Sequence, residues 1–133
     1  MQGPDADANA PGGDGAAGAE LAGEKPVRLA DGDDLDDLIA ERERVLVEFY
    51  TKGCTLCQAM EPVLGNVSRA THVTVAMLNP REDLSLVERF SVRSVPTLLL
   101  FEDGEVVARL AEGFRGAEDV LAFVEEHTDE SVR

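Results

Sequence analysis

The chain has 133 residues, a length that suits one domain of ordinary size. It carries 27 acidic against 12 basic residues, and this net charge of −15 argues against binding to nucleic acid or to an anionic membrane surface. No apolar run approaches the roughly 20 residues that a membrane span needs. Two cysteines are too few for a secreted scaffold held by several disulfides.

The basic residues are unevenly divided, because ten are arginine and only two are lysine. A strong acid excess with little lysine resembles the composition of proteins from halophilic archaea. At about 1 M salt the Debye length is about 3 Å, so repulsion among surface carboxylates is largely screened. We therefore predict a halophilic protein, and an ordinary acidic cytoplasmic protein is the alternative.

The first 25 residues differ in composition from the rest, because Gly, Ala and Pro supply 15 of them. Such a segment cannot bury enough apolar surface to offset the entropy of ordering it. We predict a disordered acidic leader over residues 1–25, one domain over 26–128 and a short tail over 129–133. The leader lacks the positive start and apolar stretch of a secretory signal, so the expected location is cytoplasmic.

Alternating strand and helix signals begin after Pro26. Residues 27–30 are a short candidate strand. Asp31 or Asp33 can cap a helix before residue 43, in which apolar side chains recur at helical spacing. Residues 44–50 are rich in apolar and β-forming side chains, which predicts a buried central strand.

A second helix is expected to start near Cys54, and Pro62 should kink it because proline removes one backbone hydrogen bond. A third, short helix should carry Leu86, Val87 and Phe90 inward. That short helix is expected over residues 83–90, after a strand over 72–78. A hairpin of strands 97–101 and 105–110 and a helix around 120–124 should complete the chain.

The resulting order, β-α-β-α-β-α-β-β-α, predicts an α/β fold. Alternating strands and helices followed by a hairpin give a mixed β-sheet with helices on both faces.

The two cysteines form the sequence Cys54-Thr55-Leu56-Cys57, after a predicted strand and at the start of a predicted helix. A helix N-terminus carries roughly half a positive charge and unpaired N–H donors, which favour a thiolate over a thiol. The first cysteine should therefore be an accessible nucleophile with a pKa below the ordinary value of about 8.5. Cys57, one helical turn further on, should be more buried and act as the resolving thiol.

Other interpretations of the pair are less favoured by the sequence. A zinc site needs four ligands, and only His72 and His127 remain as further strong donors, in no ligand spacing. We therefore predict no metal site. A structural disulfide would close a very small loop and stabilise little, and two inert core cysteines remain an alternative.

Over residues 28–126 the sequence resembles the thioredoxin family. Besides the cysteine pair, the resemblance rests on the strand Val45-Leu46-Val47-Glu48-Phe49-Tyr50, on Pro62, on Ser94-Val95-Pro96-Thr97 and on the closing hairpin from Thr97 to Val106. It implies a thioredoxin fold and a thiol–disulfide oxidoreductase that reduces protein disulfides, without a cofactor of its own. The implied partners are disulfide-containing proteins and a thioredoxin reductase of the flavin and NADPH type, and the expected state is a monomer.

The resemblance also implies roles for individual residues. Pro96 would be cis and lie beside the cysteines, and the backbone of Val95 would pair with an extended substrate segment. An ordinary trans proline is the alternative. Glu48 stands where most thioredoxins hold a buried Asp, so it would shuttle the proton of Cys57, unless it faces solvent on an edge strand.

The sequence departs from the family pattern next to the cysteines. Gly53 stands where the family carries a tryptophan, which should open the rim of the site and alter the choice of partner. Thr55 and Leu56 replace the familiar Gly-Pro between the cysteines, and this predicts a somewhat more oxidising pair. The alternatives to a reductase are a more oxidising oxidase or isomerase, and an interaction module in which the cysteines are incidental.

Overall fold

The computed structural model describes residues 25–111 and 113–129. The leader predicted for residues 1–25 lies outside them apart from Lys25, and so does the tail beyond residue 129. The elements are β1 (Val27–Leu29), α2 (Gly32–Glu41), β2 (Arg44–Phe49), α3 (Thr55–Ala70), β3 (Thr74–Leu78), the 3₁₀ turn η1 (Pro80–Glu82), α4 (Ser85–Arg89), β4 (Thr97–Glu102), β5 (Glu105–Leu110) and α5 (Ala117–His127).

The five strands form one mixed sheet in the order β1-β3-β2-β4-β5. β3 runs parallel to β1 and β2, whereas β4 is antiparallel to β2 and to β5. β2 is therefore the central strand, as the sequence predicted. Asp103 and Gly104, both with positive φ, form the two-residue turn between β4 and β5, a conformation that glycine adopts without strain.

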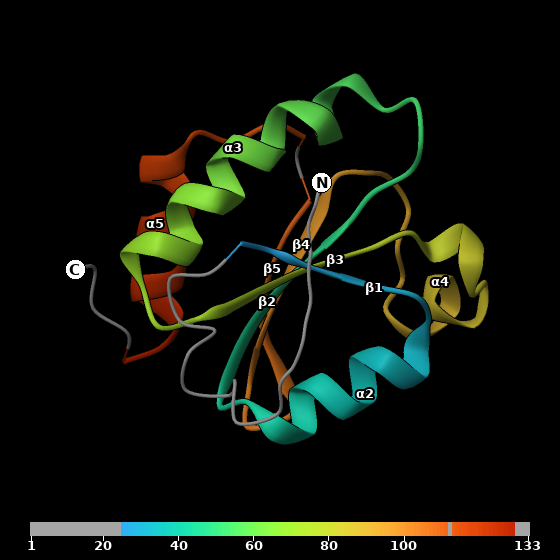
Figure 1. Cartoon of the computed structure of the whole chain (residues 1–133), viewed down its shortest axis with the longest axis horizontal. Helices are drawn as coiled ribbons and strands as arrows, with labels where there is room; N and C mark the ends of the chain where they lie inside the picture. Colours follow the sequence, from blue (N-terminus) through green and yellow to red (C-terminus); the bar gives the residue numbers. More distant parts are fainter. Residues whose placement is uncertain (1–24, 112, 130–133) are drawn as a thin grey trace.

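Helices cover both faces of the sheet, with α3 and α5 on one side and α2 and α4 on the other (Figure 1). Alternate residues of β2 point to opposite faces, so Val45, Val47 and Phe49 enter the core beneath α2 and α4, while Leu46 enters the core beneath α3 and α5. This arrangement confirms the predicted mixed sheet with a helical layer on each face.

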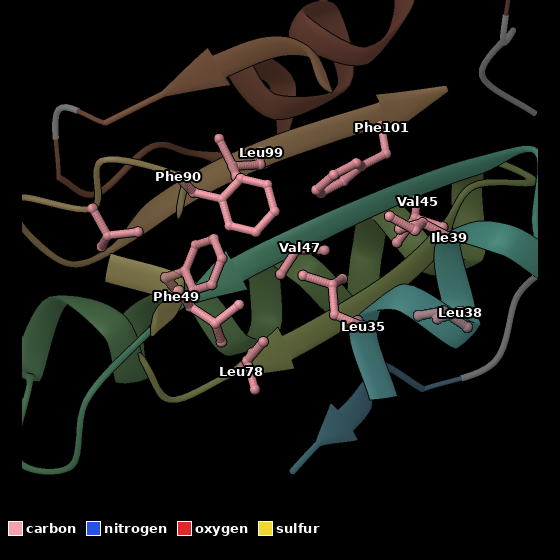
Figure 2. Close-up of a cluster of buried hydrophobic side chains, with 13 residues drawn as sticks. Leu35, Leu38, Ile39, Val45, Val47, Phe49, Leu78, Phe90, Leu99 and Phe101 are labelled. Carbon is pink, nitrogen blue, oxygen red and sulfur yellow. The ribbon is translucent and has the colours of Figure 1, made fainter. Parts of the chain in front are cut away.

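The core on the α2 side is a continuous aromatic and aliphatic cluster (Figure 2). Leu35 from α2 lies near Val47, and the rings of Phe49, Phe90 and Phe101 come from three different segments. The Phe90 ring lies 5.9 Å from that of Phe49 and 5.7 Å from that of Phe101, the latter edge to face. These contacts fix the segment after α4 against the central strands.

The predicted start of the third strand was wrong. β3 starts at Thr74 rather than at residue 72, because the Thr71 hydroxyl bonds to Val67 at the end of α3 and accepts the N–H of Val73, which makes a turn. All five residues of β3 are buried, so its pattern is that of a strand covered on both faces rather than an alternating one.

The short helix predicted over residues 83–90 is α4, which spans only Ser85–Arg89, and the 3₁₀ turn η1 before it was not predicted. The Asn79 side chain accepts the N–H of Arg81 and starts η1, and Asp83 accepts the N–H of Ser85 at the start of α4. Leu86 and Phe90 point inward as predicted, whereas Val87 is only half-buried.

Helix α2 begins where the sequence indicated. The Asp31 carboxylate accepts the N–H of Asp34 at 3.0 Å, which satisfies one of the donors that every helix start leaves unpaired. Leu35, Leu38 and Ile39 then face the sheet. The cap therefore holds the first turn of a helix that covers one side of the central strand.

We predict that Asp31→Ala lowers the free energy of unfolding by about 1 kcal/mol, because the capping bond is lost. Asp37→Ala is the matched control: it removes the same charge from an exposed position inside the same helix and should change stability by less than about 0.5 kcal/mol. Urea denaturation measures both. Equal losses in the two variants would show that charge, and not the cap, sets the effect.

Candidate active site

The two cysteines lie at the junction of the central strand and α3. Cys54 is the N-cap residue of α3, and Cys57 lies in its first turn. The two form a disulfide with their Cα atoms 5.2 Å apart. The N–H of Cys57 donates to the Cys54 sulfur at 3.1 Å. The helix start thus directs a hydrogen-bond donor and its positive dipole end at Cys54, as predicted.

The two sulfur-bearing residues differ in their exposure. Cys54 is half-buried, whereas Cys57 is only 3% exposed. An incoming disulfide can therefore reach the first cysteine but not the second. This asymmetry supports the predicted division between an attacking and a resolving thiol.

The predicted proline loop lies at the same end of the sheet. The Val95–Pro96 peptide bond is cis, so the trans alternative was wrong. Because Phe49 of β2 pairs with Thr97 of β4, the residues before Thr97 lie beside those that lead from Phe49 to the cysteines. Pro96 is buried and Val95 half-buried. Within the part of the chain that the structure describes, the backbone of Val95 has no hydrogen bond and remains available to an extended segment.

Gly53 adopts a conformation that other residues rarely take, with a φ of 78°. It is exposed, and a Cβ atom built on it would meet nothing within 4 Å. The space next to Cys54 is therefore open, as the missing aromatic residue indicated.

Glu48 lies in the central strand and is completely buried, so the edge-strand alternative was wrong. Its strand neighbours are Met77 and Leu98, and neither carboxylate oxygen has a hydrogen-bond partner within the described residues. Burial raises the pKa of Glu48 to about 8, the negative charge of Glu61 adds to this rise, and Arg28 opposes it. Glu48 is thus an acid that titrates in the range where a thiol gains or loses its proton.

A polar cluster near Glu48 was not predicted. Arg28 donates to the Tyr50 hydroxyl at 3.2 Å, lies over the Tyr50 ring at 5.5 Å, and pairs with Glu61 at 3.4 Å. Glu61 and Tyr50 also line a cavity of about 220 Å³ that reaches Cys57. Tyr50 and Glu61 stand 22 and 33 positions after Arg28 along the chain, so no local pattern brings the three together.

No cluster of three or more His, Cys, Asp or Glu side chains that could hold a metal ion occurs within residues 25–111 and 113–129. In the same part of the chain, no helix has the length and apolar character to span a membrane.

The fold and the paired cysteines define a thiol–disulfide exchange protein. Residues 26–126 match the family model described as thioredoxin. The chain is 33% identical over 102 residues to a thioredoxin of Chlamydia pneumoniae, an alignment that covers 76% of this chain and 98% of that protein. A thioredoxin of Mycobacterium tuberculosis is 33% identical over 105 residues, which are 77% of this chain and 87% of that protein.

A solved structure agrees with these relatives. A mutant thioredoxin from Halobacterium salinarum superposes with a TM-score of 0.75 at 31% identity, over 80% of this chain and 94% of that one. The chain belongs to the thioredoxin family. With its Cys54–Cys57 pair, it is a thioredoxin-type thiol–disulfide oxidoreductase with protein-disulfide reductase activity.

We predict that Glu48 makes stability depend on pH. The pKa of Glu48 is about 8 in the folded chain against 4.5 when unfolded, so between these values the folded state holds a proton that the unfolded state has lost. Its contribution to folding therefore falls as pH rises from about 5 to 8, by up to about 1.4 kcal/mol per pH unit.

The Glu48→Gln variant tests this, because it removes the titration while keeping the shape. Urea denaturation at pH 5 and pH 8 gives the free energy of unfolding of both proteins. From pH 5 to pH 8, the free energy of unfolding of the variant should rise relative to that of the wild-type chain by a few kcal/mol. Parallel pH profiles of the two proteins would contradict a buried, titrating Glu48.

Proposed function

We propose that Cys54 is the attacking thiol and Cys57 the resolving thiol. The observation that carries this assignment is the N–H of Cys57 directed at the half-buried Cys54 sulfur, while Cys57 itself is buried. The Cys54 thiolate attacks a substrate disulfide, forms a bond to one substrate sulfur and releases the other as a thiolate. Cys57 then attacks the Cys54 sulfur, which closes the Cys54–Cys57 disulfide and releases the second substrate thiolate.

Glu48 takes part by accepting the proton of Cys57. The resolving thiol must lose its proton before it attacks, and a carboxylate with a pKa near 8 is well matched to a thiol of about 8.5. Burial supplies that match, because the same carboxylate in water would be a far weaker base. Two electrons pass from the dithiol to the substrate, and the proton of Cys57 passes to Glu48.

The substrate segment lies against Val95, Pro96 and Gly53. The unpaired backbone of Val95 supports pairing with an extended chain, as in strand addition. The open space at Gly53 supports access for a protein substrate rather than only a small disulfide. Together these features support substrates whose disulfide lies in an extended, accessible segment.

The partners are disulfide-containing proteins and a thioredoxin reductase of the flavin and NADPH type that returns the pair to the dithiol state. The protein itself acts as a monomer without a cofactor. It works in the cytoplasm, where thiols are kept reduced and a disulfide reductase can be regenerated. The net charge of −15 and the similarity to a Halobacterium salinarum thioredoxin support function at high salt.

We predict that Cys57→Ser accumulates a covalent adduct with disulfide substrates, because the mixed disulfide on Cys54 is no longer resolved. Non-reducing electrophoresis and mass measurement detect the adduct. Cys54→Ser is the matched control and should form none. An adduct in the Cys54→Ser variant instead would reverse the two roles, and no adduct in either would refute the exchange mechanism.

We also predict that Glu48→Gln slows resolution of the mixed disulfide by about 10²-fold, within the range of general base catalysis, without unfolding the domain. Stopped-flow measurement across pH 6–9 follows the step. Initial attack by Cys54 should be much less affected. An unchanged rate of resolution would remove Glu48 from the mechanism.

A further inference from the structure

Two cavities are lined by residues of the segment that contains the cis proline. One, of about 410 Å³, is lined by Thr51 and Val95 next to the cysteine loop. The other, of about 400 Å³, includes Thr97, the residue after Pro96. Arg93 and Ser94 line both, so the two cavities are adjacent. We call them together the proline-loop groove.

The charged side chains of the proline-loop groove are all positive. Arg81 and Arg93 line the larger cavity, Arg93 and Arg109 the smaller one, and no Asp or Glu is among the described lining residues of either. In a chain with 27 acidic and 12 basic residues, composition alone would place more acids than bases there. The groove is therefore a local cationic region on a strongly acidic protein.

Two of these arginines are not engaged elsewhere. Arg81 and Arg93 are exposed, and their side chains have no hydrogen bond or ion pair within the described residues. By contrast, Arg89 pairs with Asp36 at 2.7 Å, and Arg109 donates to the carbonyl groups of Phe90 and Ser91. Arg109 thus holds the segment at Phe90 and Ser91 in place, whereas Arg81 and Arg93 are available to a ligand.

The larger cavity also has an apolar side. Leu84 is 68% exposed, and the half-buried Val87 and Val95 line the same cavity. An exposed leucine beside two unpaired arginines fits a segment that carries both an apolar side chain and a carboxylate. Free anions without an apolar part would leave Leu84 uncovered.

We propose that the proline-loop groove binds an acidic, partly apolar extended segment next to the disulfide of the partner protein, with Arg81 and Arg93 contacting its carboxylates. This inference rests on the proposed function, because it places the segment beside the same Val95 that pairs with substrate. Charge complementarity is the argument for this occupant, since carboxylates are the groups that unpaired arginines bind best. The groove thereby selects among substrates that all carry a disulfide.

The test uses the reduced full-length protein and synthetic peptide disulfides in 1 M KCl, where only charges in direct contact interact appreciably. Three peptides share one sequence with a leucine near the cysteine, flanked by Glu, Gln or Lys. Stopped-flow measurement gives the second-order rate constant of oxidation of the protein by each. We expect the Glu peptide to react about fivefold to tenfold faster than the Lys peptide.

The variant Arg93→Glu should reduce this preference to about twofold or less, and Arg81→Glu should weaken it. Arg69→Glu is the matched control, because it makes the same charge change at an exposed position on α3, outside the groove, and should keep the preference. Equal losses in the control would mean that net charge, not the groove, selects the peptide, and would overturn the proposal.

A small uncharged disulfide, hydroxyethyl disulfide, distinguishes failure of the groove proposal from failure of the proposed function. If the wild-type chain reduces it but does not distinguish the Glu from the Lys peptide, the groove proposal fails and the proposed function stands. If neither hydroxyethyl disulfide nor any of the three peptides oxidises the protein, the proposed function fails.

The chain's own residues 1–24 are the competing occupant, because they contain five acids, Asp5, Asp7, Asp14, Glu20 and Glu24, and no basic residue. Replacing these acids with Asn or Gln in the full chain should leave the peptide preference unchanged. A preference that appears only in this variant would identify the leader as the occupant and overturn the proposal.

Discussion

The hydrogen bond from the Cys57 N–H to the Cys54 sulfur is the contact on which the active site depends. It exists because the central strand ends at Phe49 and the next helix begins with Cys54 as its cap, so a sulfur occupies the position that an oxygen usually fills. The same junction fixes the other parts of the site. The register of β2 with β4 brings the cis-proline segment to this end of the sheet, and alternation along β2 directs Glu48 into the opposite core from Phe49.

Glu48 illustrates the conflict between stability and chemistry. A buried carboxyl without a hydrogen-bond partner destabilises the fold whenever it is charged, and a leucine there would suit the core better. Its neighbours do little to relieve this, because Glu61 raises the pKa while the Arg28 that opposes it is itself paired with Glu61 and bonded to Tyr50. The central strand thus retains an acid whose value to the protein lies in accepting a proton near neutral pH.

Much of this was predictable because it depends on local signals. Four features follow from neighbours in the chain: the order of strands and helices along it, the Asp31 cap, the cysteine pair at a helix start, and the buried position of Glu48 between Val47 and Phe49. The Arg28–Tyr50–Glu61 cluster and the position of Arg93 between two cavities do not, because they join side chains from distant segments. The turns at Thr71 and Asn79 were missed because single side-chain hydrogen bonds end or start an element there, against the hydrophobic pattern.

The whole exchange reaction requires that Cys54 and Cys57 form a reversible redox pair. The most direct test equilibrates the purified chain in molar KCl with redox buffers of known potential and counts free thiols by alkylation and mass. We predict a single two-electron transition, with two thiols lost together, at a potential between about −270 mV, typical of thioredoxin, and about −180 mV, where disulfide isomerases lie. The more oxidising end would favour an oxidase or isomerase over a reductase. The absence of any intramolecular disulfide across the whole range would contradict the account and leave an interaction module with incidental cysteines.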